Sequence, residues 1–151
     1  MSMNVVALTP DRFSDFIRLI NALAEYEKLD PPAEDALDRL YGDAFGSAPR
    51  FIAFLALTEH NEAIGYAICF ETYSSFLALP SMYLEDLFVL EEYRRSGAGG
   101  SLFDRVVELG RERGCGRVDW QVLDWNMLAR DFYARRGATS MSEWLLYRIT
   151  L

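Results

Sequence analysis

The chain has 151 residues, of which hydrophobic residues make up 51% and charged residues 25%. This length and composition predict a single globular domain over residues 1–151 and exclude disordered, collagen-like and low-complexity chains. The formal net charge of −8 argues against recognition of nucleic acid through its phosphates.

The cysteine and histidine content argues against a metal site. Cys69, Cys115 and the single histidine, His60, are too few and too widely spaced to hold zinc. The first residues have no basic start followed by an apolar run, and no stretch is long enough to cross a membrane. With free thiols and no export segment, the protein is expected in the cytoplasm, away from membranes.

Charge is unevenly distributed along the chain. Residues 1–93 contain 5 basic and 16 acidic side chains, whereas residues 94–151 contain 10 basic and 7 acidic ones. This asymmetry suits one cationic and one anionic ligand, and chance unevenness on a solvated surface explains it equally well.

Hydrophobic periodicity predicts alternating strands and helices. In chain order, the expected elements are strand 4–8, helix 11–27, helix 34–41, a hairpin of strands 51–57 and 63–70, loop 72–80, strand 82–90, helix 101–113, strand 117–123, helix 127–135 and strand 144–151. Alternation along strand 82–90 places Tyr83 and Glu85 on one face and Leu84, Asp86 and Phe88 on the other. The order predicts a mixed α/β (α+β) sheet with one strand–helix–strand crossover.

A glycine-rich junction joins the strand 82–90 to the next helix. Gly97, Gly99 and Gly100 follow Arg94 and Arg95. Such a junction presents unpaired amides at the positive end of a helix dipole, and glycine lets a ligand approach them closely. The spacing Arg-x-x-Gly-x-Gly matches neither the Walker loop nor the dinucleotide-binding pattern. We therefore expect a phosphate or pyrophosphate site here, the alternative being a plain turn.

The run Tyr93-Arg94-Arg95-Ser96-Gly97-Ala98-Gly99 resembles the acetyl-CoA loop of the GNAT superfamily of N-acetyltransferases. Other segments resemble its diamine (spermidine/spermine) and thialysine acetyltransferase branch, in the right order: 23–27, 83–89, 125–126, 132–133 and 135–138. The resemblance covers nearly the whole chain. It implies a sheet of six to seven strands, splayed at the cofactor cleft and flanked by about four helices.

The resemblance also implies an activity and a cofactor. The activity is direct transfer of an acetyl group from acetyl-CoA to a primary amine of a diamine, a polyamine or a lysine analogue such as thialysine. The implied cofactor-binding residues are Leu87, Phe88, Val89, Arg94, Arg95, Ser96, Gly97, Ala98, Gly99, Gly100, Asn126, Tyr133 and Arg135. A homodimer is implied as well.

Two proton transfers set requirements on the catalytic side chains. An alkyl ammonium titrates near ~10.4, so it must lose a proton before it attacks. Glu85, a carboxylate in an apolar strand, is expected to take that proton, directly or through water; the alternative is an edge-strand charge or an ion-pair partner. The resemblance implies that Tyr133 protonates the departing CoA thiolate, the alternative being an aromatic anchor of its helix.

The resemblance implies acidic side chains that bind the cationic acceptor, and aromatic side chains are expected to enclose its alkylammonium chain. These are Tyr26, Glu27, Tyr73, Phe76, Glu85, Asp86 and Glu143. The polyamine enzymes carry more acidic residues before the position of Trp144 and an indole at the position of Phe76, so the sequence favours a shorter acceptor. The alternatives are a protein N-terminal or lysine acetyltransferase, an aminoglycoside acetyltransferase, and a non-catalytic CoA-binding regulatory module.

Overall fold

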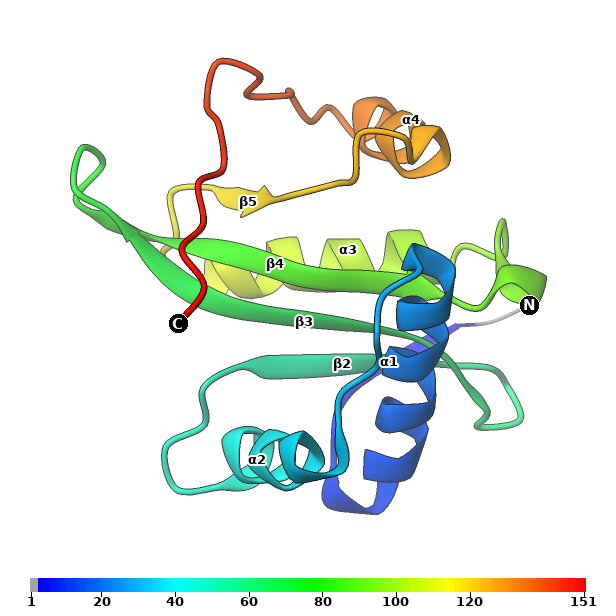
Figure 1. Cartoon of the computed structure of the whole chain (residues 1–151). Coiled ribbons are helices and arrows are strands. Elements are labelled where there is room, and N and C mark those ends of the chain that lie inside the picture. The colour runs from blue at the N-terminus through cyan, green and yellow to red at the C-terminus, as the bar shows by residue number, and fades with distance from the viewer. Residues whose placement is uncertain (1–2) are drawn as a thin grey trace. The chain divides into compact units, whose positions relative to one another are not determined.

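The computed structural model describes residues 3–151, and the chain separates into a first compact unit that ends at Trp120 and a second unit, Gln121–Leu151. The strands and α-helices of the first unit are β1 (Asn4–Ala7), α1 (Phe13–Glu27), α2 (Glu34–Phe45), β2 (Ile52–Leu57), β3 (Ala63–Ser74), β4 (Leu79–Val89), α3 (Ala98–Glu112) and β5 (Val118–Trp120) (Figure 1). The second unit contains α4 (Met127–Arg135). The mixed α/β architecture predicted from the sequence is confirmed.

One sheet organises the first unit. Its strand order is β1-β2-β3-β4-β5, and every neighbouring pair is antiparallel except β4 and β5, which are parallel. The parallel pair is connected through α3, as the predicted crossover requires. Figure 1 shows α1 and α3 on opposite faces of the sheet. Strands β2 and β3 are therefore buried on both faces, which explains their nearly continuous apolar sequences.

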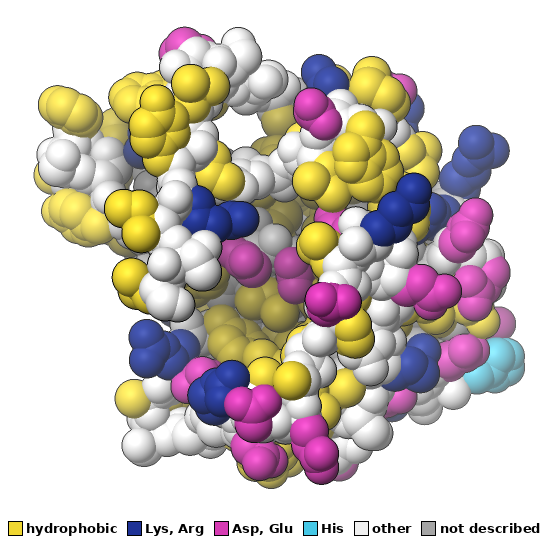
Figure 2. Space-filling view, in the orientation of Figure 1, with side chains coloured by type: hydrophobic (Ala, Val, Ile, Leu, Met, Phe, Trp, Pro, Cys, Tyr) yellow, Lys and Arg dark blue, Asp and Glu magenta, His cyan; other side chains and the backbone are white. Residues whose placement is uncertain are grey.

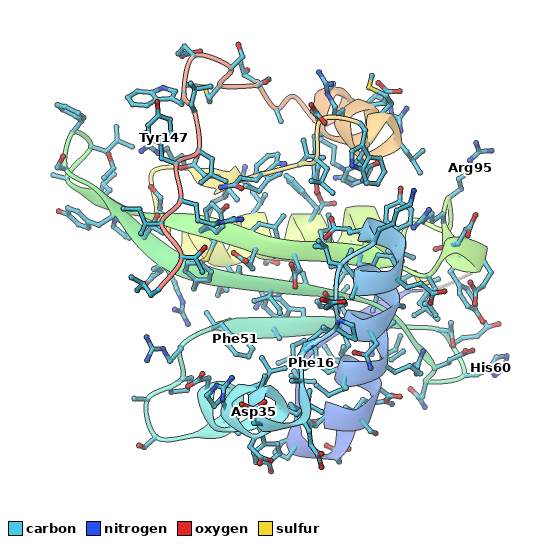
Figure 3. The ribbon with its side chains drawn as sticks, in the orientation of Figure 1. Phe16, Asp35, Phe51, His60, Arg95 and Tyr147 are labelled. Carbon is cyan, nitrogen blue, oxygen red and sulfur yellow. The ribbon has the colours of Figure 1, made fainter. Side chains whose placement is uncertain are left out.

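Two apolar clusters fill the space between the sheet and these helices. On one face, Leu102 and Val106 of α3 pack with Met82 and Leu84 of β4. On the other face, Phe16 and Leu19 of α1 pack with Tyr66 of β3 and Phe88 of β4. Phe16 also stacks against Phe51 with the ring centroids 6.3 Å apart, and Figure 3 shows this pair beside α1.

Some element boundaries differ from the prediction. The helix α2 continues through Gly42 to Phe45, and β3 and β4 extend into the expected loop 72–80 as a long hairpin. The helix α3 begins at Ala98, so Gly99 and Gly100 belong to its first turn. Periodicity locates the apolar centre of an element better than its ends, because polar residues at the ends leave the pattern open.

The expected last strand is absent. The described residues form five strands, not six to seven, and residues 144–151 form none of them. The side chains of Trp144, Leu145, Leu146 and Tyr147 are largely exposed. An apolar run identifies a segment that favours burial, but a strand also requires a partner that the run does not specify.

A β-bulge at Glu85 changes the side-chain alternation of β4. Leu84 pairs with Cys69 and Asp86 pairs with Ile68, so Glu85 is the extra residue. Our expectation that Leu84 and Phe88 share a face is therefore wrong. Leu84 lies in the cluster beneath α3, and Phe88 lies in the cluster beneath α1.

Candidate active site

The loop between β4 and α3 contains backbone amides that the protein itself leaves unpaired. Gly97 is the N-cap of α3 and has a φ of +91°, which glycine adopts readily. Ser96 N–H donates to Tyr93 O at 3.3 Å, and Ala98 N–H donates to the Ser96 hydroxyl at 3.3 Å. Within residues 3–151, four other loop amides donate to no protein acceptor: those of Arg95, Gly97, Gly99 and Gly100. This geometry fits a diphosphate at a helix N-terminus.

The two loop arginines have different surroundings. The Arg95 side chain is exposed, and Figure 3 shows it pointing outward from the loop. The Arg94 guanidinium lies 4.6 Å from the ring centroid of Tyr26, and its Nε donates to Val89 O at 3.3 Å. Arg95 is therefore available to an anion, whereas Arg94 connects the loop to α1 and β4.

The edge of β4 that faces β5 is only partly paired. Pairing with β5 ends at Leu84, so residues 85–89 have no strand partner on that edge within the described chain. Leu90 N–H donates to Ile64 O on the β3 side. Because strand amides alternate in direction, the amides of Leu87 and Val89 face the open edge, while Phe88 pairs with Tyr66. The expected splay of the sheet is present, and Leu87 and Val89 offer donors there.

An acidic cluster lies on the α1 face of the sheet, formed by Glu27, Glu85 and Asp86. Glu27 is the last residue of α1, and the other two residues lie at the bulge of β4. The Tyr66 hydroxyl donates to Asp86 Oδ2 at 3.0 Å. The pKa of Asp86 is raised to about 6, mainly by burial and also by the nearby Glu85 and Glu27, and the Tyr66 hydrogen bond opposes the rise.

Burial also acts on Glu27 of the cluster and on the neighbouring Tyr66. Burial raises the pKa of Glu27. The pKa of Tyr66 is raised far above its usual value, first by burial and then by the charge of Asp86. Negative charges that are partly removed from water and repel one another favour a cationic ligand. The structure therefore brings together three of the residues that were expected to bind the acceptor: Glu27, Glu85 and Asp86.

The acidic excess of residues 1–93 has a second location. Glu34, Asp35 and Asp38 of α2 are exposed, and Figure 2 shows acidic side chains over this helix. Asp35 forms an exposed ion pair with Arg39 at 3.1 Å. The acidic side chains of residues 1–93 therefore include solvated charges on α2 and the partly buried charges of the acidic cluster.

Two aromatic residues expected at the acceptor site lie elsewhere on the hairpin. Tyr73 pairs with Pro80, and Phe76 lies in the turn that follows, with the whole side chain exposed. Asp86 pairs with Ile68, five residues before Tyr73, which corresponds to about 16 Å along a strand. The hairpin therefore does not bring Tyr73 and Phe76 to the acidic cluster.

The remaining expected residues belong to the second unit. Asn126 caps α4, since its Oδ1 accepts from Ala129 N–H at 3.1 Å. Tyr133 lies on the same helix, and burial raises its pKa to about 12. Arg135 lies at the end of α4, beside a hollow that Phe132 and Arg136 also line. Glu143 is exposed in the segment beyond the helix.

Tyr66 is the site residue that the sequence did not identify. It lies within the apolar strand β3, where a tyrosine is ordinarily a core residue, and its side chain is fully buried. Its role depends on its pairing opposite Phe88 and on the bulge that turns Asp86 toward it. The sequence signal that could have identified it is a single tyrosine hydroxyl in an apolar strand, because a buried hydroxyl usually has a hydrogen-bond partner.

The described residues include no group of three or more histidine, cysteine, aspartate or glutamate side chains arranged to hold a metal ion. Between residues 3 and 151, every helix is too short or too polar to span a membrane.

Known proteins resemble this chain over most of its length. Residues 15–138 match the acetyltransferase (GNAT) family. A thialysine N-epsilon-acetyltransferase of Bos taurus is 35% identical over 136 residues, which cover 85% of this chain and 79% of that protein. The thialysine N-epsilon-acetyltransferase of Caenorhabditis elegans is 29% identical over 98% of this chain and 92% of its own length. A solved structure of an integron cassette protein of V. cholerae has a TM-score of 0.82 at 24% identity, covering 99% and 93% of the two chains, and shows the same fold.

Proposed function

The chain belongs to the acetyltransferase (GNAT) family, and we propose that it transfers the acetyl group of acetyl-CoA to a primary amine of a small cationic acceptor. One observation carries this proposal: the strand β4 combines an acidic cluster with an unpaired edge and leads directly into the loop with unpaired amides. An ammonium group, an extended amide-containing arm and a diphosphate are the ligands that these three features recognise.

The donor substrate binds through the backbone in this proposal. The amides of Arg95, Gly97, Gly99 and Gly100 hold the diphosphate, and the Arg95 side chain adds positive charge. The open edge at Leu87 and Val89 pairs with the pantetheine arm, and one amide there polarises the thioester carbonyl. Asn126 and Arg135 of the second unit remain proposed contacts of the same substrate.

The acceptor binds through charge. Glu27 and Asp86 hold the ammonium group, and Glu85, the exposed member of the acidic cluster, takes the proton that leaves it, directly or through water. In the reaction the acceptor nitrogen replaces the CoA sulfur on the acetyl carbon, so a C–N bond forms and a C–S bond breaks. The ammonium loses one proton, and the CoA thiolate gains one.

Tyr133 is proposed to protonate the thiolate. Because burial raises its pKa to about 12, the phenol stays protonated over the whole working pH range. A protonated hydroxyl is the state that a general acid requires.

The relatives and the acidic cluster support a short acceptor with more than one ammonium group, such as a diamine or a lysine analogue like thialysine. Three carboxylates in one place suit more than a single positive charge. We also propose a homodimer, with the exposed apolar residues after Met141 as candidate contacts, and a cytoplasmic location, which the free thiols of Cys69 and Cys115 permit.

The experiment is CoA release from acetyl-CoA, measured with a panel of acceptors: putrescine, spermidine, thialysine, lysine, an aminoglycoside and a peptide with a free N-terminus. We expect the highest kcat/KM with putrescine or thialysine. Release with the peptide alone would indicate a protein acetyltransferase, and binding of acetyl-CoA with no release would indicate a regulatory module.

A matched pair of variants tests the role of the acidic cluster. Glu27→Gln should raise the KM of dicationic acceptors at least tenfold, because it removes a partly buried charge. Glu25→Gln removes an exposed charge from the same helix and should leave the KM unchanged. An equal loss with every amine, charged or not, would contradict charge recognition by Glu27.

A further inference from the structure

The Tyr66 side chain is held rigidly between two layers of the protein. Its ring packs edge-on against Phe16 of α1, with ring centroids 5.6 Å apart, and also contacts Phe88 at 6.5 Å. The residue has no solvent-exposed surface. Because close packing restricts the ring, the hydroxyl has one direction available, and it points to Asp86 Oδ2 at 3.0 Å.

Three titratable groups act on Asp86, one from each element around it. Glu27 of α1 and Glu85 of β4 disfavour a negative charge at Asp86, whereas Tyr66 of β3 favours it by donating a hydrogen bond. The phenol never competes as an acid, because its own pKa is raised far above the working range. Tyr66 is therefore a permanent donor to one carboxylate oxygen.

The second carboxylate oxygen of Asp86, Oδ1, differs from Oδ2 in its hydrogen bonding. Within the part of the chain that the structure describes, Oδ1 accepts no hydrogen bond. A half-buried carboxylate with one oxygen fixed and the other open can present that oxygen to a ligand in one defined direction.

We infer that Tyr66 is a positioning residue for the amine acceptor: it fixes Oδ2 of Asp86 so that Oδ1 binds the acceptor ammonium. This inference rests on the proposed function. In this inference the charge of Asp86 binds the ammonium group of the amine, and Glu85 remains the group proposed to take its proton.

The test is the variant Tyr66→Phe, which removes the hydroxyl and keeps the ring. Without its hydrogen bond, Asp86 should bind its proton about one pH unit more tightly. The acidic limb of kcat/KM for the amine, expected near pH 6, should therefore move up by about one unit. At pH 6.5 the KM of the amine should rise about threefold, because the ionised fraction of Asp86 falls by that factor, whereas kcat at pH 8.5 and the KM of acetyl-CoA should stay within about twofold. An acidic limb that does not move overturns the inference.

Two controls separate positioning from a general effect on the fold. Tyr41→Phe removes a hydroxyl from a half-exposed tyrosine of α2 and should leave the pH profile unchanged. Asp86→Asn still offers an oxygen to Tyr66 but cannot titrate, so its residual activity should show no acidic limb near pH 6. Persistence of the limb in Asp86→Asn overturns the inference even if Tyr66→Phe does not fold.

An NMR titration of Asp86 distinguishes a failure of this inference from a failure of the proposed function. The carboxyl carbon of Asp86, followed by NMR in protein without substrates, should titrate about one pH unit higher in Tyr66→Phe than in the wild type. An unshifted titration in an enzyme that acetylates amines defeats the inference alone. A wild-type protein that acetylates no amine defeats the proposed function, whatever the titration shows.

Discussion

Replacing Asp86 by asparagine is expected to stabilise the protein at pH 8 while removing most of its activity toward amines. The reason is that Asp86 is a carboxylate held in a half-buried place beside Glu27 and Glu85, where the ionised form is unfavourable. Asparagine has nearly the same shape and still offers an oxygen to the Tyr66 hydroxyl. The substitution therefore removes the charge with little change in packing.

The size of the effect follows from the pKa of Asp86. Its value is about 6 in the folded protein against the usual 3.8. At about 1.4 kcal/mol for each pH unit, the ionised carboxylate lowers the free energy of unfolding by about 3 kcal/mol. This corresponds to a rise in Tm of about 6–12 °C for the variant. The penalty is complete above pH 6, where Asp86 is ionised in both states, and it disappears below pH 3.8, where both states bind the proton.

The measurement is urea unfolding of the wild type and Asp86→Asn at several pH values between 4 and 8. The variant should be more stable at pH 8, and the difference should shrink through pH 6 and vanish near pH 4. Asp35→Asn is the control, because it removes an exposed carboxylate that pairs with Arg39 and whose pKa that arginine lowers, so it should give no gain. A wild type as stable as Asp86→Asn at pH 8, or a difference independent of pH, would refute the reasoning.

Three further predictions concern other parts of the chain. Tyr133→Phe should lower kcat about 10²- to 10⁴-fold, while the Kd of acetyl-CoA from calorimetry stays unchanged; unchanged turnover would remove Tyr133 from the acid role. Gly97→Ala should lower the free energy of unfolding by about 1–2 kcal/mol and weaken acetyl-CoA binding, because φ is +91° although the new methyl meets no atom within 4 Å. Ala78→Gly should raise the free energy of unfolding in urea by about 0.5–1 kcal/mol, since Ala78 has a φ of +54°, and a loss would contradict the strain argument.

Local chemistry made several features of the structure predictable from the sequence. Asn126 was expected to begin a helix over 127–135, and the structure has that helix with that cap. The strand–glycine–helix junction was expected, and the loop around Gly97 has this form. Capping, glycine conformation and periodicity depend on neighbours in the chain, so a single sequence contains the necessary information.

The features that escaped prediction depend on partners distant in the sequence. The bulge at Glu85 arises from the pairing of β4 with β3, and an alternating pattern read along β4 alone cannot reveal an extra residue. The bond between Tyr66 and Asp86 joins residues twenty positions apart and requires that register. The absence of a strand at 144–151 was unpredictable for the same reason, because an apolar run does not specify the strand with which it would pair.

The bulge also explains how one strand can carry both a core and a charged site. In an unbroken strand, Asp86 would lie on the same face as Met82 and Leu84, which pack beneath α3 in a cluster of apolar side chains. A carboxylate there would have no donor and would be strongly unfavourable. The extra residue at Glu85 shifts the alternation by one, so Asp86 reaches Tyr66 on the α1 face and Leu87 returns to the apolar cluster.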